Sequence, residues 1–512
     1  MFRADAARSG CTDQPLPEQL KLRWTYAAGH APQPAWQADD TRMDFDYAYH
    51  TVLSDGRVYF GSSADGKIYA LDADSGEETW SFFTDGPVRF APAIWKDRLF
   101  AVSDDGFLYC LDKKTGYLLW KKYGAKEEQR ILGNDRIISK WAARGAPLVD
   151  HDTVYFAAGI WPSEGIYFHA LDAENGKDKW TNEESGSLEM LQPHSAMSKS
   201  GASAQGYLAA GGGILLSPTG RAVPAAFDER NGNFKYFHLN KYSPAGGSSI
   251  AVAGRGFFNG GKIFDLQTGE LIQDLKAKDL AAIPGGAAAL FDNKIVLYQW
   301  KDVEKIDRKG KRYTVQLLQE TASVETENGG HSIIAVKNLI VAGGLESVEA
   351  FRLSNLGKTW SASIQGIPLG LAAADGKLIV STDQGVIYCF DEAGAQTPKT
   401  VRPDRDDSPY GSNEELAEQA KTILKRSGVG HNGYCLDLGC GDGALAYELA
   451  QRTNLHIYAI DSDPEMVRTA RRKLDAAGLY GVRVTVHQQD PQSTDYPDYF
   501  ADLIVSRRSI QE

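Results

Sequence analysis

The sequence predicts two domains, an all-β propeller of eight blades over residues 1–394 and an α/β domain with a parallel sheet over residues 412–512. Three observations support this prediction. The 512 residues exceed what one hydrophobic core usually supports. A strand-and-turn unit recurs as far as residue 394, and an apolar strand runs into a glycine turn near residue 438. Residues 395–411, which are charged and contain prolines, have the composition of a linker.

The propeller prediction rests on an internal repeat, because a fixed repeating unit indicates a repeat architecture. Residues 58–80 read as a strand, an Asp-Gly turn, a second strand, a Leu-Asp turn that ends in Gly, and a third strand that ends in Trp. Other copies, some degenerate, are found at residues 99–120, 154–180, 207–237, 257–272, 295–318, 339–360 and 378–394. Together with the 52 glycines of the chain, these eight copies predict eight small antiparallel sheets.

Each part of the repeat has a physical role. We expect Asp65-Gly66 and Asp105-Gly106 to form two-residue hairpin turns. In the next turn, Asp72 is placed to accept backbone N–H groups and Gly76 to adopt a left-handed conformation. The tryptophans that end the third strands are expected to pack between neighbouring sheets; they are Trp80, Trp120 and Trp180.

A calcium loop is the alternative for the second turn, because residues 72–77 contain alternating carboxylates at Asp72 and Asp74, as a calcium loop does. The equivalent turns at residues 112–116 and 265–269 keep the first Asp and the Gly but lose the alternating carboxylates. We therefore expect turn formation and no metal site.

The eighth copy lacks its last strand, since it stops at Gly394 without a Trp. Residues 22–26, which contain Trp24, form an orphan strand at the other end of the domain. If this strand completes the last blade, the ring closes and both free sheet edges disappear.

These repeats resemble the pyrroloquinoline-quinone (PQQ) repeat family, which includes quinoprotein alcohol dehydrogenases and non-catalytic outer-membrane assembly lipoproteins. The resemblance covers about three quarters of the chain, and residues 2–10 resemble the family's lead-in before the first blade. It implies the fold but no single function. Dehydrogenases of this family hold their quinone with calcium, a stacking Trp and an adjacent cysteine pair. No Cys-Cys dipeptide occurs here, so we do not expect PQQ as a cofactor.

The second domain opens with a helix that Ser412 or Asn413 caps and Gly428 ends. An apolar strand from Tyr434 then runs into a glycine turn and a second helix, a pattern that lets backbone approach a ligand closely. The next strand ends in Asp461, where a carboxylate can accept both hydroxyls of a ribose. The sequence therefore predicts a ligand that contains ribose.

A nicotinamide dinucleotide is one candidate, since Gly439, Gly441 and Ala444 fit the dinucleotide fingerprint. Asp437 argues against it, because a carboxylate two residues before the first glycine would repel a pyrophosphate. The same carboxylate suits a ligand that carries an ammonium and a sulfonium group.

The segment resembles class I S-adenosylmethionine (SAM) dependent methyltransferases, with a Rossmann-like sheet. Their first motif has the form seen at Asp437, Gly439, Gly441 and Gly443. The resemblance implies that Asp437 serves the methionine end of SAM, Asp461 the ribose with Ser462 beside it, and Asp490 the adenine amino group.

Two points about this domain stay open. Asp502 opens the fourth predicted strand and is either structural or part of the site. Only four strands of the family's larger sheet are predicted before Glu512. The domain is thus expected to be the N-terminal half of a methyltransferase, incomplete at its C-terminus, within a longer protein.

Composition narrows the function without identifying an acceptor. A net charge of −12 with no dominant Lys/Arg cluster does not indicate a nucleic-acid surface, and no run of about 18 apolar residues predicts a membrane span. Three functions remain: a methyltransferase with a propeller as interaction or scaffold module, a scaffold with an inactive half-domain, and a quinoprotein oxidoreductase. The catalytic residues, the methyl acceptor, a protein partner of the propeller and the cellular compartment are not specified.

Overall fold

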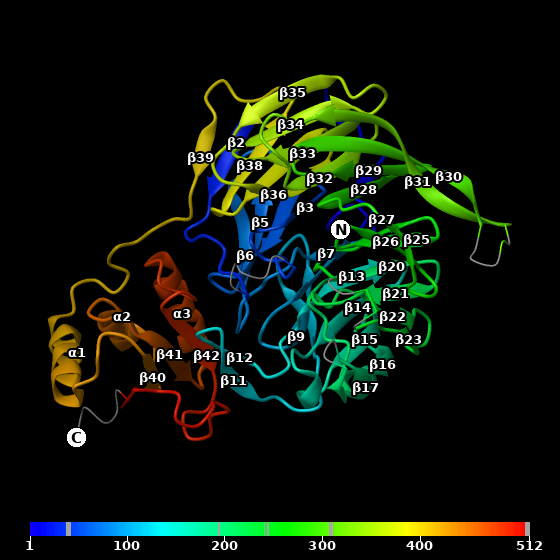
Figure 1. The fold of residues 1–512 in the computed structure, drawn as a ribbon. Coiled ribbons are helices and arrows are strands. Elements are labelled where there is room, and N and C mark those ends of the chain that lie inside the picture. Colours follow the sequence, from blue (N-terminus) through cyan, green and yellow to red (C-terminus); the bar gives the residue numbers. More distant parts are fainter. Residues whose placement is uncertain are drawn as a thin grey trace.

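A computed structural model describes residues 1–36, 42–192, 195–239, 241–242, 245–306, 310 and 312–506. Figure 1 shows a ring of β-sheets with a smaller α/β domain packed against one side of it. Among the described residues, no helix is both long and apolar enough to span a membrane.

The ring contains eight sheets in chain order, so the eight-bladed prediction is confirmed. The first four blades are β3 (Thr51–Ser54), β4 (Arg57–Gly61), β5 (Lys67–Asp72) and β6 (Glu78–Phe83); β7 (Ala93–Trp95), β8 (Arg98–Val102), β9 (Phe107–Asp112) and β10 (Leu118–Tyr123); β13 (Gly145–Asp150), β14 (Thr153–Ala158), β15 (Tyr167–Asp172) and β16 (Asp178–Asn182); β20 (Ala209–Gly211), β21 (Ile214–Ser217), β22 (Ala225–Asp228) and β23 (Phe234–Tyr236).

The other four blades follow the same antiparallel order. They are β24 (Ala251–Ala253), β25 (Gly256–Asn259), β26 (Lys262–Asp265) and β27 (Leu271–Asp274); β28 (Asp279–Ile283), β29 (Gly286–Leu290), β30 (Lys294–Ile306) and β31 (Arg312–Glu325); β32 (Ser332–Val336), β33 (Leu339–Gly344), β34 (Ser347–Arg352) and β35 (Lys358–Ser363); β36 (Pro368–Ala374), β37 (Lys377–Thr382), β38 (Val386–Asp391) and β2 (Lys21–Ala27).

Short elements decorate this ring. β1 (Cys11–Thr12) pairs in parallel with β32, and β19 (Gly206–Tyr207) pairs in parallel with β13. β39 (Lys399–Val401) pairs in parallel with β2. Two hairpins and two 3-10 turns lie outside the blades. The hairpins are β11 (Arg130–Gly133) with β12 (Arg136–Ser139) and β17 (Leu188–Leu191) with β18 (Met197–Ser200), and the 3-10 turns are Pro162–Glu164 and Ser185–Ser187.

The ring closes as the incomplete eighth repeat predicts. β2 pairs antiparallel with β38, with Trp24 opposite Cys389. The N-terminal strand therefore becomes the fourth strand of the last blade and covers the free β38 edge of the incomplete repeat.

The repeated Trp and Gly residues contact each other between blades. Trp80 of blade 1 lies over Gly116 of blade 2, where a Cβ would come within 2.7 Å of the indole ring. Trp24 and Gly76 make the same contact across the closure of the ring. Each of these glycines has a left-handed backbone conformation, and because glycine has no Cβ it leaves room for the neighbouring ring.

The two kinds of turn differ in how well they were predicted. Asp72 acts as expected, because its Oδ1 accepts hydrogen bonds from the backbone N–H groups of Asp74 and Ser75 at 3.0 and 2.8 Å. The prediction of two-residue turns at Asp65-Gly66 and Asp105-Gly106 was wrong, since residues 62–66 and 103–106 separate the strands. In each turn the Asp accepts a hydrogen bond from the tyrosine hydroxyl four residues later.

The C-terminal domain has one parallel sheet in the order β42-β41-β40-β43. Asn413 caps the first helix by accepting a hydrogen bond from the Leu416 N–H, and Gly428 ends that helix in a left-handed conformation. The elements are α1 (Glu414–Ser427), β40 (Tyr434–Leu438), α2 (Ala444–Ala450), β41 (His456–Asp461), α3 (Pro464–Ala476), β42 (Val484–Gln488) and β43 (Leu503–Ser506).

Candidate cofactor site

The glycine turn after β40 borders open space. Gly439 and Gly441 have φ values of +73° and +55°, and a Cβ built on either residue would meet no atom within 4 Å. Gly443, at +84°, is instead crowded, because its Cβ would lie 2.9 Å from the Tyr410 hydroxyl. The first two glycines thus expose backbone to a space that a ligand could fill, and the third permits close packing.

Asp461 lies at the carboxyl end of β41, directly beside this turn. Its Oδ2 accepts a hydrogen bond from the Gly441 N–H at 2.9 Å, and its Oδ1 accepts one from the Asp463 N–H at 2.9 Å. Each carboxylate oxygen retains a further lone pair, so the same group can also accept hydroxyl hydrogens. The structure therefore brings together Asp461 and Gly441, which are twenty residues apart.

Asp437 in β40 and Asp490 in the loop after β42 lie on either side of β41 in the sheet. Asp437 is fully buried in β40. Gln489 N–H donates to the Asp461 carbonyl at 3.0 Å, which ties the loop after β42 to the end of β41. Asp490 follows immediately and is exposed, as is Ser462. The seven residues expected at the cofactor site thus all lie in β40, β41 or the loops at the carboxyl edge of the sheet.

Tyr410 is a neighbour of the turn that sequence analysis did not single out. Its hydroxyl donates to the Asp442 carbonyl at 2.8 Å, and the Lys473 ammonium lies 4.6 Å from its ring centroid. The available signal was one aromatic residue in a charged segment, but nothing local shows that the segment folds back on the glycine turn.

Asp502 lies away from the site. Its carboxylate accepts a hydrogen bond from the Tyr434 N–H at 2.8 Å, at the amino end of β40. This contact joins the starts of two parallel strands, so the open question about Asp502 is answered by a structural role.

The propeller contacts this domain through buried and partly buried charged groups. Arg471 of α3 pairs with Asp85, and the Lys67 ammonium lies 2.7 Å from both carboxylate oxygens of Asp475. The Ile137 N–H donates a hydrogen bond to the Tyr458 hydroxyl at 2.7 Å. In Figure 1, α3 and β42 lie next to the β11–β12 hairpin of the propeller.

At the centre of this junction, His487 is held between the domains. Its Nε2 lies 3.0 Å from the Asp85 carbonyl and its Nδ1 lies 2.6 Å from the Tyr496 hydroxyl. Burial, with Arg130 nearby, holds the pKa of His487 well below its usual value. The ring is therefore neutral, so Nε2–H donates to Asp85 while Nδ1 accepts from Tyr496.

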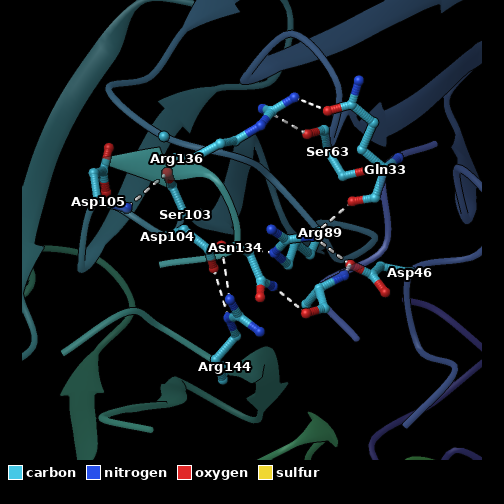
Figure 2. Close-up of polar contacts among 12 residues, drawn as sticks. Gln33, Asp46, Ser63, Arg89, Ser103, Asp104, Asp105, Asn134, Arg136 and Arg144 are labelled. Carbon is cyan, nitrogen blue, oxygen red and sulfur yellow. Dashed lines mark hydrogen bonds and ion pairs between the residues drawn. The ribbon is translucent and has the colours of Figure 1, made fainter. Parts of the chain in front are cut away.

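A second polar cluster lies among the propeller loops (Figure 2). Arg89 bridges Asp46 and Asp104 at 2.5 and 2.6 Å, and Arg144 pairs with the other side of Asp104 at 2.7 Å. All four residues are at most 5% exposed. The two cations and the two carboxylates pair with each other. We therefore interpret this cluster as a structural link between loops.

Comparison with known proteins supports both domains. A family model described as "Methyltransferase domain" matches residues 435–512, and one described as "Outer membrane protein assembly factor BamB" matches residues 29–140. The quinone-dependent alcohol dehydrogenase subunit of Gluconobacter oxydans is 30% identical over 143 residues, which are 25% of this chain and 18% of that protein.

Two further relatives extend the comparison. A probable cobalt-precorrin-6B C(15)-methyltransferase of Methanothermobacter thermautotrophicus is 41% identical over 61 residues, covering 12% of this chain and 31% of that protein. The quinohemoprotein alcohol dehydrogenase of Comamonas testosteroni has a similar fold, with a TM-score of 0.52, 15% identity and 93% of each chain covered.

The matched stretches span less than a third of either curated relative, so they show domain types and not whole proteins. Repeats, fold and family matches agree nonetheless. The chain is a fusion of an eight-bladed β-propeller of the PQQ-repeat type and a C-terminal methyltransferase domain.

Proposed function

We propose that the chain is a SAM-dependent methyltransferase whose propeller serves as an interaction or scaffold module. The observation that carries this proposal is the pairing of Asp461 with a glycine turn that borders open space. A side chain on Gly439 or Gly441 would occupy that space, as expected of a surface that a ligand touches. The methyltransferase family match over the same residues supports the proposal.

The roles of the residues follow from their positions. Asp461 would accept the ribose hydroxyls, with Ser462 beside it; Asp490 would accept the adenine amino group; and Asp437 would face the cationic methionine end. The backbone of Gly439, Gly441 and Gly443 would line the ligand between them. Three carboxylates around one site favour a cationic ligand over a pyrophosphate.

SAM supplies an already activated methyl group on its sulfonium. The protein therefore needs to orient the cofactor, align an acceptor and exclude water, and no covalent catalyst is required. The acceptor class is not specified by the residues described. A propeller scaffold with an inactive domain is the alternative, and SAM binding separates the two.

Replacing Gly441 by alanine is expected to weaken SAM binding by more than about tenfold, because the new methyl group enters the ligand space and the backbone has a positive φ. Calorimetric titration of the full chain with SAM measures this effect.

Gly428→Ala is the matched control. Gly428 has a φ of +63° and also has no atom near its missing Cβ, but it ends α1. Both substitutions carry the same kind of backbone cost, so only Gly441→Ala should change SAM affinity. Equal affinities for the two variants would contradict the proposed site.

A further inference from the structure

A cavity of about 250 Å³ lies where the two domains meet. The loop after β42 lines one side with Gln488, Gln489 and Asp490. Blade 2 and the loop that follows it line the other side with Phe107, Lys121 and Glu128. Asp490, the residue assigned to the adenine amino group, therefore faces the propeller across this space.

The cavity has a wall that the domain junction holds in place. Arg471 pairs with Asp85 and also donates to the Val486 carbonyl from Nε at 3.0 Å, which fixes β42 against the propeller. His487 at the end of β42 adds its bond to the Asp85 carbonyl. The loop that carries Asp490 thus starts from a strand that is anchored on the propeller.

The charges of the cavity indicate what it can hold. Carboxylates outnumber cations in the lining, and Arg130 is already 3.2 Å from Asp495. Burial and the Asp85 carboxylate raise the pKa of Asp105 to about 6, as expected where negative charge accumulates. A phosphate is disfavoured in such a cavity, whereas a group that donates hydrogen bonds is favoured.

The apolar part of the wall is aromatic. The rings of Phe107 and Tyr123 lie 4.9 Å apart, and the Lys121 ammonium lies 4.0 Å from the Phe107 centroid. A flat heterocycle with an exocyclic amino group matches an aromatic wall with carboxylates around it.

We propose that blade 2 forms the outer wall of the adenine subsite, so that the purine of SAM is bound between Asp490 and the propeller. This inference rests on the proposed function and adds to it that the propeller is part of the cofactor site. Glu128 then provides negative potential beside the amino group, and SAM binding depends on both domains.

The test is Glu128→Lys in the full chain, titrated with SAM and with adenosine. Glu128 is exposed, so the fold should be unaffected. The introduced ammonium can pair with Asp490 and remove the acceptor of the purine amino group. We expect both ligands to bind about ten- to a hundredfold more weakly, as the loss of one hydrogen bond to a charged group implies.

Glu127→Lys is the matched control, because Glu127 is the exposed neighbour with the same charge and does not line the cavity. Its effect should stay within about twofold, because an exposed charge that does not line the cavity is screened by water and salt. If SAM binds the unmodified chain but Glu128→Lys binds it equally well, the propeller wall is wrong and the proposed function stands. If the unmodified chain binds no SAM, the proposed function itself fails.

Discussion

Replacing Asp85 by alanine is expected to release the C-terminal domain from the propeller. The Arg471 guanidinium is 14% exposed and has Asp85 as its carboxylate partner across the junction. Removal of one member of a buried ion pair leaves the other charge desolvated without compensation. The substitution also leaves Arg130 with one carboxylate fewer nearby.

The expected cost is about 2–4 kcal/mol of docking free energy, somewhat below the range for fully buried pairs because the Asp85 side chain is 28% exposed. Hydrogen exchange of the Ile137 amide reports on docking, since its N–H donates to Tyr458 across the junction. The rate at which this amide exchanges when the domains undock should rise by about thirty- to a thousandfold.

Glu18→Ala is the control, because it removes an Arg–carboxylate pair whose side chains are 45% and 39% exposed. Such surface pairs contribute about 0–1 kcal/mol, so the Ile137 amide should exchange at its original rate. An Asp85→Ala protein with unchanged exchange at Ile137 would show that the junction does not depend on this pair.

The Asp85–Arg471 pair also makes the docking of the two domains depend on pH. Burial alone would raise the pKa of Asp85, but the Arg471 and Arg130 guanidinium groups lower it below its usual value. A carboxyl group whose pKa is lower in the folded chain stabilises it above about pH 4 and loses that contribution as the pH falls through the folded-state pKa. Docking through Asp85 should therefore be constant near neutral pH and fail only in strong acid.

Replacing Asp461 by alanine is expected to weaken SAM binding by about ten- to a hundredfold. Two hydrogen bonds from ribose hydroxyls to a carboxylate are worth roughly 1.5–3 kcal/mol each, and water recovers part of the loss. The structure adds a second reason, since the Asp461 carboxylate also holds the Gly441 N–H and hence the glycine turn. Asp461→Asn keeps one acceptor oxygen, so its affinity should be intermediate.

Asp502→Ala provides a matched control for this series. Asp502 also accepts a backbone N–H with its carboxylate, but at the amino edge of the same sheet. Loss of its bond to Tyr434 should lower stability without a change in SAM affinity, as measured by calorimetry and thermal unfolding. If Asp461→Ala remains folded and binds SAM as tightly as the parent, the ribose assignment is wrong.

The fold was predictable where the sequence repeats a complete local signal. Trp24 could be assigned to the last blade because the eighth repeat lacks its Trp strand and residues 22–26 have no other copy to join. The turn at Asp72 was predictable for the same reason, since Asp and Gly recur at fixed spacing and each has one physical role.

Local patterns failed where backbone pairing alone decides the structure. β39 consists of Lys399, Thr400 and Val401, which show no alternation, and it forms because β2 offers an unpaired edge. It lies inside the segment expected to be a linker. The turns at Asp65 and Asp105 were predicted too short, since the strands before them already end at Gly61 and Val102.

The site was predictable only in part. The glycine turn and Asp461 follow from motif spacing, because both occur at strand ends in one parallel sheet. The junction could not be predicted, since Asp85 and Arg471 are separated by 386 residues and each is an ordinary surface charge in its local sequence. The contact of Tyr410 with the glycine turn and the cavity beside Asp490 could not be predicted either, because they also join residues that are far apart in the sequence.

The central claim is tested most directly by calorimetric titration of the full chain with SAM and, separately, with a nicotinamide dinucleotide. Both ligands contain a ribose for Asp461, so they differ in the pyrophosphate that the carboxylates around the glycine turn should repel. We expect saturable binding of SAM and no binding of the dinucleotide. Binding of the dinucleotide in preference to SAM, or no binding of SAM, would contradict it.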